Sequence, residues 1–298
     1  MGNVHLDKII EYNKIEDVNN QRGKDYTGPY IFPKVKDFQK ETVEHFQNKS
    51  LIENNIEKMN RFRDRPCLGR RLKVGENENG EPIFDNKYTY YTYNDVHVMC
   101  KKFAKNLHEK KDELIYKDSY KGLNFNLVGI FAKNCTEWVV ADMGCQMDSV
   151  TTATLYATLG REAFKYICDQ TKIKTVMVSP DLVDMLCEFK KLYSLEQLST
   201  AILFDMTTYC DSKKELEKLK NAGFVAYSFV DDFQKENENV KDSDLEISNP
   251  DTIMTICYTS GTTGDPKGVM LSQRNLISVL ETVIRDSSVP IDENDGHN

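Results

Sequence analysis

From residue 87 onward, the hydrophobic positions of the chain change period in a regular alternation. Short β-branched or apolar runs alternate with longer segments in which apolar side chains recur at helical spacing. The first pattern is typical of buried strands, and the second is typical of amphipathic helices. Because the two patterns follow one another along the chain, they predict an α/β fold with largely parallel sheets, flanked by helices and joined by right-handed crossovers.

The predicted elements are short and closely spaced. The segment 87–93 is expected to be a strand or a hairpin. The other expected strands are 126–132, 150–156, 174–179, 201–205, 224–230, 252–260 and 268–272. The expected helices are 50–65, 94–110, 136–147, 160–172, 179–193, 212–223 and 273–286.

Capping residues predict where several helices begin or end. Asn94 or Asp95 is expected to start one helix, and Thr136 another. Ser179 followed by Pro180 at the first helical position is a strong start signal. Gly223 stands where a residue of positive φ commonly ends a helix.

Residues 1–86 show little periodic order and are assigned to an N-terminal extension, with one expected loop at 73–82. Residues 87–298 are assigned to the main domain. A charged connection at 234–251 precedes its last strands.

Charge and cysteine content exclude some classes of protein. The chain has 47 acidic and 39 basic residues, a net charge of −8, which argues against a nucleic-acid partner. Its eight cysteines form no C-x-x-C pair and lie mostly in apolar runs, which favours free buried thiols over a zinc site or disulfides. No apolar run reaches the roughly 20 residues of a membrane span.

The segment "YTSGTTGDPKGVMLS", residues 258–272, carries the clearest chemistry. Its glycines allow close approach of the backbone to a ligand, its hydroxyls donate hydrogen bonds, and its lysine supplies a positive charge. Together these groups suit the oxygens of a polyphosphate such as that of ATP. The expected phosphate-binding residues are Thr259, Ser260, Gly261, Thr262, Thr263, Gly264, Lys267 and Gly268.

This segment is not a Walker A loop, which requires G-x-x-x-x-G-K-[ST] and a helix directly after it. Here a strand is expected after the loop, so a helix dipole is not the main source of phosphate binding. The alternative is a glycine-rich hairpin without a ligand, which the clustering of hydroxyls and Lys267 disfavours.

"YTSGTTGDPKGVMLSQRN" resembles the signature loop of the adenylate-forming superfamily. Further segments resemble the long-chain fatty acyl-CoA synthetases within it, and the resemblance extends from about Arg65 to the end of the chain. These segments are "RPCLGRR" at 65–71, "YYTYNDV" at 90–96, "VGIFAKNCTEWVVADMGC" at 128–145 and "LYATLGREAFKYI" at 155–167. Two positions depart from the family pattern: Ala157 replaces an Asp, and Gln273 replaces a His that in the family lies near the phosphates.

The resemblance implies an incomplete N-terminal domain of an adenylate-forming enzyme. Such a ligase joins a fatty acid to ATP, giving an acyl-adenylate and pyrophosphate, and then transfers the acyl group to coenzyme A with Mg²⁺ assistance. Lys267 and the loop hydroxyls would hold the β and γ phosphates, and Gln273 would lie near that site. No catalytic set is complete in this chain and no metal ligand is identified, so the isolated chain is expected to be inactive.

Two other functions are compatible with the residues. One is a catalytically inactive module that binds ATP or phosphate, and the other is part of an enzyme that adenylates a different carboxylic acid. The resemblance implies an intracellular location, cytoplasmic or on the cytosolic face of the endoplasmic reticulum. Membrane association of the full enzyme and self-association of this chain are further expectations. Trp138 is expected to pack between helix and sheet, and the five histidines to lie on the surface.

Overall fold

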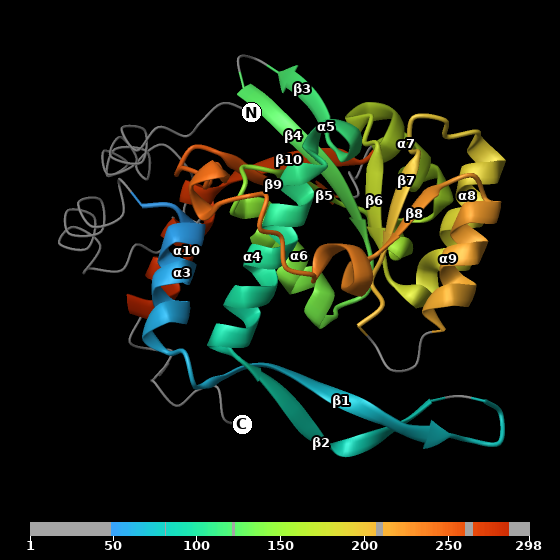
Figure 1. Ribbon diagram of the computed structural model, residues 1–298. Helices are drawn as coiled ribbons and strands as arrows, with labels where there is room; N and C mark the ends of the chain where they lie inside the picture. Colours follow the sequence, from blue (N-terminus) through green and yellow to red (C-terminus); the bar gives the residue numbers. More distant parts are fainter. Residues whose placement is uncertain (1–48, 81, 121–122, 207–210, 260–264, 286–298) are drawn as a thin grey trace, which may run out of the picture. The chain divides into compact units, whose positions relative to one another are not determined.

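The computed structural model describes residues 49–80, 82–120, 123–206, 211–259 and 265–285 (Figure 1). These residues all belong to one compact unit, Phe46–Asn298.

A sheet of eight strands forms the centre of the described part of this unit. The strand order is β10-β9-β5-β4-β6-β7-β8, and β3 pairs with β4 outside this path. All contacts from β9 through β8 are parallel, whereas β10 and β3 pair antiparallel with their neighbours. The strands are β3 (Tyr116–Tyr120), β4 (Leu123–Phe131), β5 (Thr151–Thr154), β6 (Thr175–Val178), β7 (Thr200–Leu203), β8 (Val225–Ser228), β9 (Ile253–Thr259) and β10 (Lys267–Ser272). The predicted α/β class with a largely parallel sheet is confirmed.

Helices cover both faces of the sheet, which explains the continuous apolar strands. Along β7, Ala201 and Leu203 pack into one core cluster, and Ile202 packs into the other. The first cluster includes residues of α7, α8 and α9, and the second includes residues of α3, α4 and α6. The helices are α3 (Leu51–Arg61), α4 (Tyr93–Glu109), α5 (Lys111–Leu114), α6 (Thr136–Gln146), α7 (Arg161–Thr171), α8 (Val183–Tyr193), α9 (Ser212–Asn221) and α10 (Gln273–Arg285).

Four shorter helical turns lie between these elements in the described residues. They are the 3₁₀ turns Ala157–Leu159, Pro180–Leu182 and Asp242–Asp244 and the π-helical turn Phe229–Phe233. The predicted strand 224–230 therefore ends earlier, at Ser228.

Two of the predicted helix starts are wrong by one or more residues. Thr92 caps α4, because its hydroxyl accepts from the Asp95 N–H at 3.1 Å and the Asp95 carboxylate accepts from the Thr92 N–H at 2.8 Å. This reciprocal capping box places Asp95 inside the helix. Cys135, not Thr136, is the cap residue of α6. The stop at Gly223 is confirmed by its φ of 86°.

A two-stranded hairpin connects α3 to α4 and lies at the lower edge of the unit in Figure 1. Its strands are β1 (Pro66–Glu76) and β2 (Pro82–Thr92), which pair antiparallel. The expected loop at 73–82 is shorter than predicted, because β1 continues through its first four residues. The expected domain boundary after residue 86 falls within β2.

Candidate functional site

The glycine- and threonine-rich segment joins two antiparallel strands, as the sequence predicts. Thr259, the last residue of β9, is the cross-strand partner of Lys267, the first residue of β10. Both ends of the loop are therefore held in one ladder. The predicted residues Ser260, Gly261, Thr262, Thr263 and Gly264 lie outside the described residues.

Thr259, at the end of β9, lies at the carboxyl edge of the parallel sheet. β9 runs parallel to β5, with Thr154 of β5 paired to Cys257 of β9. The residues after β5, including the exposed Tyr156, therefore lie at the same edge as Thr259. Two segments about a hundred positions apart meet there, and this is the edge at which open α/β sheets bind ligands.

Lys267 has the properties of a residue that receives an anion. It is exposed, and in the part of the chain that the structure describes no carboxylate oxygen lies within 4.0 Å of its amine. Thr259 is exposed beside it. Binding of a phosphate group by these two residues stays a prediction. Among the residues that the structure describes, no group of three or more His, Cys, Asp or Glu side chains could hold a metal ion.

Gly268 packs closely against side chains of the neighbouring strand β9. A Cβ atom at this position would lie 3.0 Å from both Ile256 Cγ2 and Tyr258 Cζ. The side of the backbone on which a side chain would stand is therefore filled, and a role of Gly268 in phosphate binding stays a prediction. Tyr258 is 4% exposed, and its hydroxyl donates to Gln170 Oε1 at 2.6 Å. Because Gly268 has no side chain, the Tyr258 ring can lie against its backbone.

Gln273, the first residue of α10, is fully buried. Its Oε1 accepts from the Ile52 N–H at 3.0 Å, and its Nε2 donates to Gln146 Oε1 at 3.1 Å. Both ends of the Gln273 amide are thus bonded to protein groups. Gln273 directly follows Ser272, the last residue of β10. A position near the phosphates stays a prediction for this side chain.

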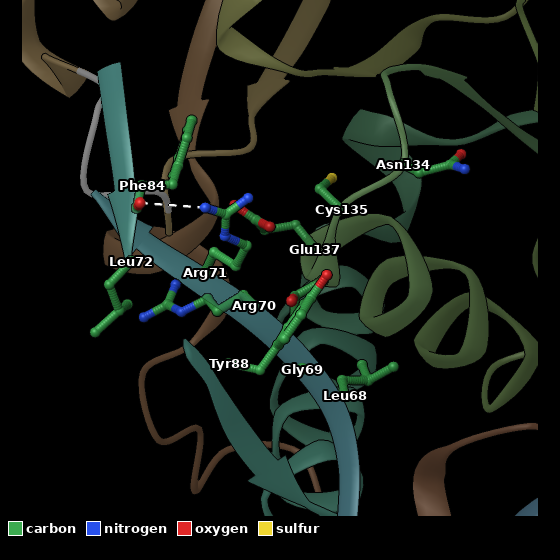
Figure 2. A pocket seen from close by; sticks show the side chains of 11 residues that line it. Leu68, Gly69, Arg70, Arg71, Leu72, Phe84, Tyr88, Asn134, Cys135 and Glu137 are labelled. Atoms are coloured by element: carbon green, nitrogen blue, oxygen red, sulfur yellow. Dashed lines mark hydrogen bonds between the residues drawn. The ribbon is translucent and has the colours of Figure 1, made fainter. Parts of the chain in front are cut away.

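A second concave region lies between the β1–β2 hairpin and the start of α6 (Figure 2), with a volume of about 500 Å³. Glu137 lines it and is 1% exposed, and its Oε1 accepts from the Met206 N–H at 3.0 Å. Burial raises the pKa of the Glu137 carboxyl. Arg70 Nη1 donates to the Met206 carbonyl at 2.9 Å, so the Met206 backbone is bonded on both sides.

Arg70 and Glu137 were predicted only as parts of segments that resemble the family. Arg70 stands in "RPCLGRR" and Glu137 in "CTEWVV". Only the tertiary structure identifies Arg70 and Glu137 as neighbours, because both bond to the backbone of Met206, which follows β7. In the local sequence, the one indication of such a role was that Glu137 is an acidic residue in the otherwise apolar start of a predicted helix.

Other side-chain expectations have mixed outcomes. The seven cysteines that the structure describes are free, as predicted. Trp138 packs against the core cluster of α4 and α6, in agreement with a packing role. His108 is not a simple surface residue, because its Nδ1 lies 3.0 Å from the fully buried carboxylate of Asp148. None of the described helices has the length and apolar character needed to cross a membrane.

Comparison with known proteins agrees with the geometry. Residues 58–295 match the AMP-binding enzyme family. Long chain acyl-CoA synthetase 4 of Arabidopsis thaliana is 32% identical over 226 residues, covering 76% of this chain and 30% of that protein. Long-chain-fatty-acid–CoA ligase 5 of Rattus norvegicus is 35% identical over 167 residues, covering 56% of this chain and 24% of that protein. The chain therefore spans less than a third of the length of these relatives.

Solved structures show the same fold at low sequence identity. The adenylation domain of a carboxylate reductase from Mycobacterium chelonae has a TM-score of 0.62 at 17% identity, covering 94% of this chain and 42% of that one. The A domain of the carboxylic acid reductase from Segniliparus rugosus, in complex with AMP and a co-purified carboxylic acid, has a TM-score of 0.64 at 16% identity. That match covers 86% of this chain and 40% of that one.

Proposed function

Because the chain belongs to the AMP-binding enzyme family of adenylate-forming enzymes, we propose that it is the ATP-phosphate-binding part of a long-chain fatty acid–CoA ligase. The relatives named as long-chain acyl-CoA synthetases and ligases support the choice of substrate. The observation that carries the proposal is the exposed Thr259–Lys267 pair at the carboxyl edge of the sheet.

The reaction explains why such a loop is needed. A carboxylate is a poor acyl donor, and joining it to AMP provides a good leaving group for attack by the thiol of coenzyme A. Negative charge accumulates on phosphate oxygens as pyrophosphate departs, so hydrogen-bond donors and cations stabilise the transition state. Lys267 would bind the β and γ phosphates through its amine, and Thr259 would donate its hydroxyl. Mg²⁺, when bound with ATP, would neutralise further phosphate charge.

The remaining groups of the proposed site come from the other loop residues. Ser260, Thr262 and Thr263 would donate hydroxyls, while Gly261 and Gly264 would allow their amides to face the phosphates. Fatty acid, ATP and coenzyme A would be the substrates. The location proposed for the enzyme is intracellular, in the cytoplasm or at the cytosolic face of the endoplasmic reticulum.

The first test measures binding of ATP–Mg²⁺ to the 298-residue chain by titration calorimetry. Lys267→Ala removes the one charged phosphate contact proposed and should weaken binding by about tenfold, because a charged hydrogen bond contributes about 1.5–3 kcal/mol. Lys213→Ala is the matched control, since Lys213 is also exposed and lies on α9. Equal ATP–Mg²⁺ binding by the two variants would show that Lys267 does not contact the phosphates.

The second test addresses the reaction and its substrate. The protein expressed from its complete reading frame should catalyse exchange between ATP and labelled pyrophosphate when palmitate is supplied. Benzoate should not support this exchange. Exchange with benzoate alone would assign a different carboxylic acid, and ATP binding without any exchange would assign a non-catalytic module.

A further inference from the structure

The cavity between the β1–β2 hairpin and α6 shares no residue with the segment 258–272. Its volume of about 500 Å³ lies within the roughly 300–1,000 Å³ range of small-molecule sites. Two strands and one helix start form its walls. The lining residues are Leu68, Gly69, Arg70, Arg71, Leu72, Phe84, Tyr88, Asn134, Cys135, Thr136 and Glu137.

Two adjacent arginines line this cavity, and uncharged groups hold both of them. Arg70 donates to the Met206 carbonyl at 2.9 Å. Arg71 donates from Nη2 to the Phe84 carbonyl at 3.2 Å, drawn as the dashed line in Figure 2, and from Nε to the Asp85 carbonyl. Within the described ranges, neither guanidinium has a carboxylate oxygen within 4.0 Å. The backbone bonds fix the side chains without neutralising their charge.

The acid of the cavity is bonded to backbone and not to the arginines. Glu137 is buried and bonded to the Met206 N–H, and it forms no ion pair with either arginine by the same 4.0 Å criterion. Burial raises the pKa of its carboxyl, and the charge of Arg70 acts in the opposite direction. An anion entering the cavity would therefore meet two guanidinium groups whose hydrogen bonds go to carbonyl oxygens and not to a carboxylate.

The walls that the two hairpin strands contribute are partly apolar. Leu68, Leu72, Phe84 and Tyr88 line the cavity together with the arginines. The backbone of Gly69 leaves room for the tyrosine rings of β2, since a Cβ atom there would lie 3.3 Å from Tyr88 Cδ1. Apolar and aromatic walls beside fixed guanidinium groups suit a ligand that has an apolar body and a charged end.

We propose that this cavity binds an amphipathic organic anion, with a carboxylate or phosphate held by Arg70 and Arg71 and an apolar or flat body against Leu72 and Phe84. A fatty carboxylate and a nucleotide monophosphate both have this chemistry. The lining residues are not those of the phosphate loop, and the inference does not depend on the proposed ligase activity.

Titration calorimetry on the 298-residue chain tests the site with two anions, octanoate and AMP, and their uncharged counterparts, octanamide and adenosine. At least one anion should bind more tightly than its counterpart, and the preferred anion identifies the carboxylate or the phosphate. Arg71→Gln should weaken that binding by about tenfold or more, since a charge-assisted hydrogen bond is lost. Arg161→Gln is the control, because Arg161 is exposed and lies outside the cavity.

Several results would overturn the proposal. They are equal binding of the anion and its uncharged counterpart, no binding of either anion, and binding that Arg71→Gln leaves unchanged. AMP binding that is weakened by Lys267→Ala but not by Arg71→Gln would be assigned to the phosphate loop. This result would also contradict the proposed site.

Arg71 is exposed, so Arg71→Gln should fold even if Arg70→Gln does not. Leu72→Ser should weaken octanoate binding in a chain with an unchanged circular dichroism spectrum.

Discussion

Gln273 and Gln146 are separated by 127 positions, yet Gln273 Nε2 donates to Gln146 Oε1 at 3.1 Å in the buried interior. Gln146 Nε2 in turn donates to Asp142 Oδ2, and Thr152 Oγ1 donates to Asp142 Oδ1, both at 2.8 Å. At its other end, Gln273 accepts from the Ile52 N–H. This polar chain connects the start of α10 with α3, α6 and β5, directly after the strand that carries the loop.

Replacing Gln273 by Met should lower the free energy of unfolding by about 2–4 kcal/mol. The variant leaves the Ile52 N–H and Gln146 Oε1 buried without a partner, and each such group costs about 1–3 kcal/mol. Urea unfolding followed by circular dichroism measures the change. Gln197→Met is the control, because Gln197 is exposed. Equal stability of the two variants would show that the polar chain contributes nothing.

Gly268→Ala should destabilise the protein by about 1–3 kcal/mol, because the new methyl group would contact Ile256 and Tyr258 at about 3.0 Å. Thermal unfolding monitors this effect. Gly75→Ala is the matched control in strand β1, since no atom lies within 4 Å of a Cβ built there. If Gly268→Ala is as stable as Gly75→Ala but binds ATP less well, Gly268 serves the ligand and not the Tyr258 ring.

Asp148→Ala should lower the free energy of unfolding by about 3 kcal/mol. The buried carboxylate accepts from the Glu246 N–H at 3.1 Å and lies 3.2 Å from the Lys111 amine, in addition to His108. Its loss would remove one of the contacts that hold the 234–251 connection, the bond from the Glu246 N–H. Asp64→Ala, at an exposed position, should change stability by less than about 0.5 kcal/mol. Hydrogen exchange at the Glu246 amide should increase only in Asp148→Ala; an unchanged rate would contradict this assignment.

Acid should weaken the contact between Asp242 and α4. Hydrogen bonds from Lys101 and Lys105 lower the pKa of Asp242 from 3.8 to about 2. Because the folded-state pKa lies below the unfolded value, the contribution to stability is present above pH 3.8 and is lost as pH falls toward 2. The Asp242 side chain is 59% exposed, so solvent screening limits the contribution to below about 1 kcal/mol.

The measurement for this pair is urea unfolding of the wild type and Asp242→Asn as a function of pH. The wild type should be the more stable of the two near neutral pH, and the difference should vanish near pH 2. Added salt should reduce the difference at neutral pH, since the pair is exposed. A difference that persists unchanged at the lowest pH would mean that the carboxylate charge is not its source.

The hydrophobic pattern determined the fold class because each buried strand must be apolar on both faces and each helix on one. In β7, neighbouring residues Ala201 and Ile202 pack into opposite clusters, which requires a helix layer on each side. The strand that returns after the loop was also predictable, from the apolar run that ends at Ser272. Local spacing suffices for these conclusions, since they depend on the chain's own periodicity.

The roles of individual polar residues were decided by the tertiary structure. The hydroxyl of Thr92 caps α4 in place of the neighbouring candidates, because a reciprocal bond with Asp95 satisfies two backbone donors. Gln273 stands in the recognised motif, yet its described contacts are with buried groups of the remote helices α3 and α6. A hydrogen bond or a packing contact between residues a hundred positions apart leaves no periodic signal in the sequence, so only the folded chain reveals it.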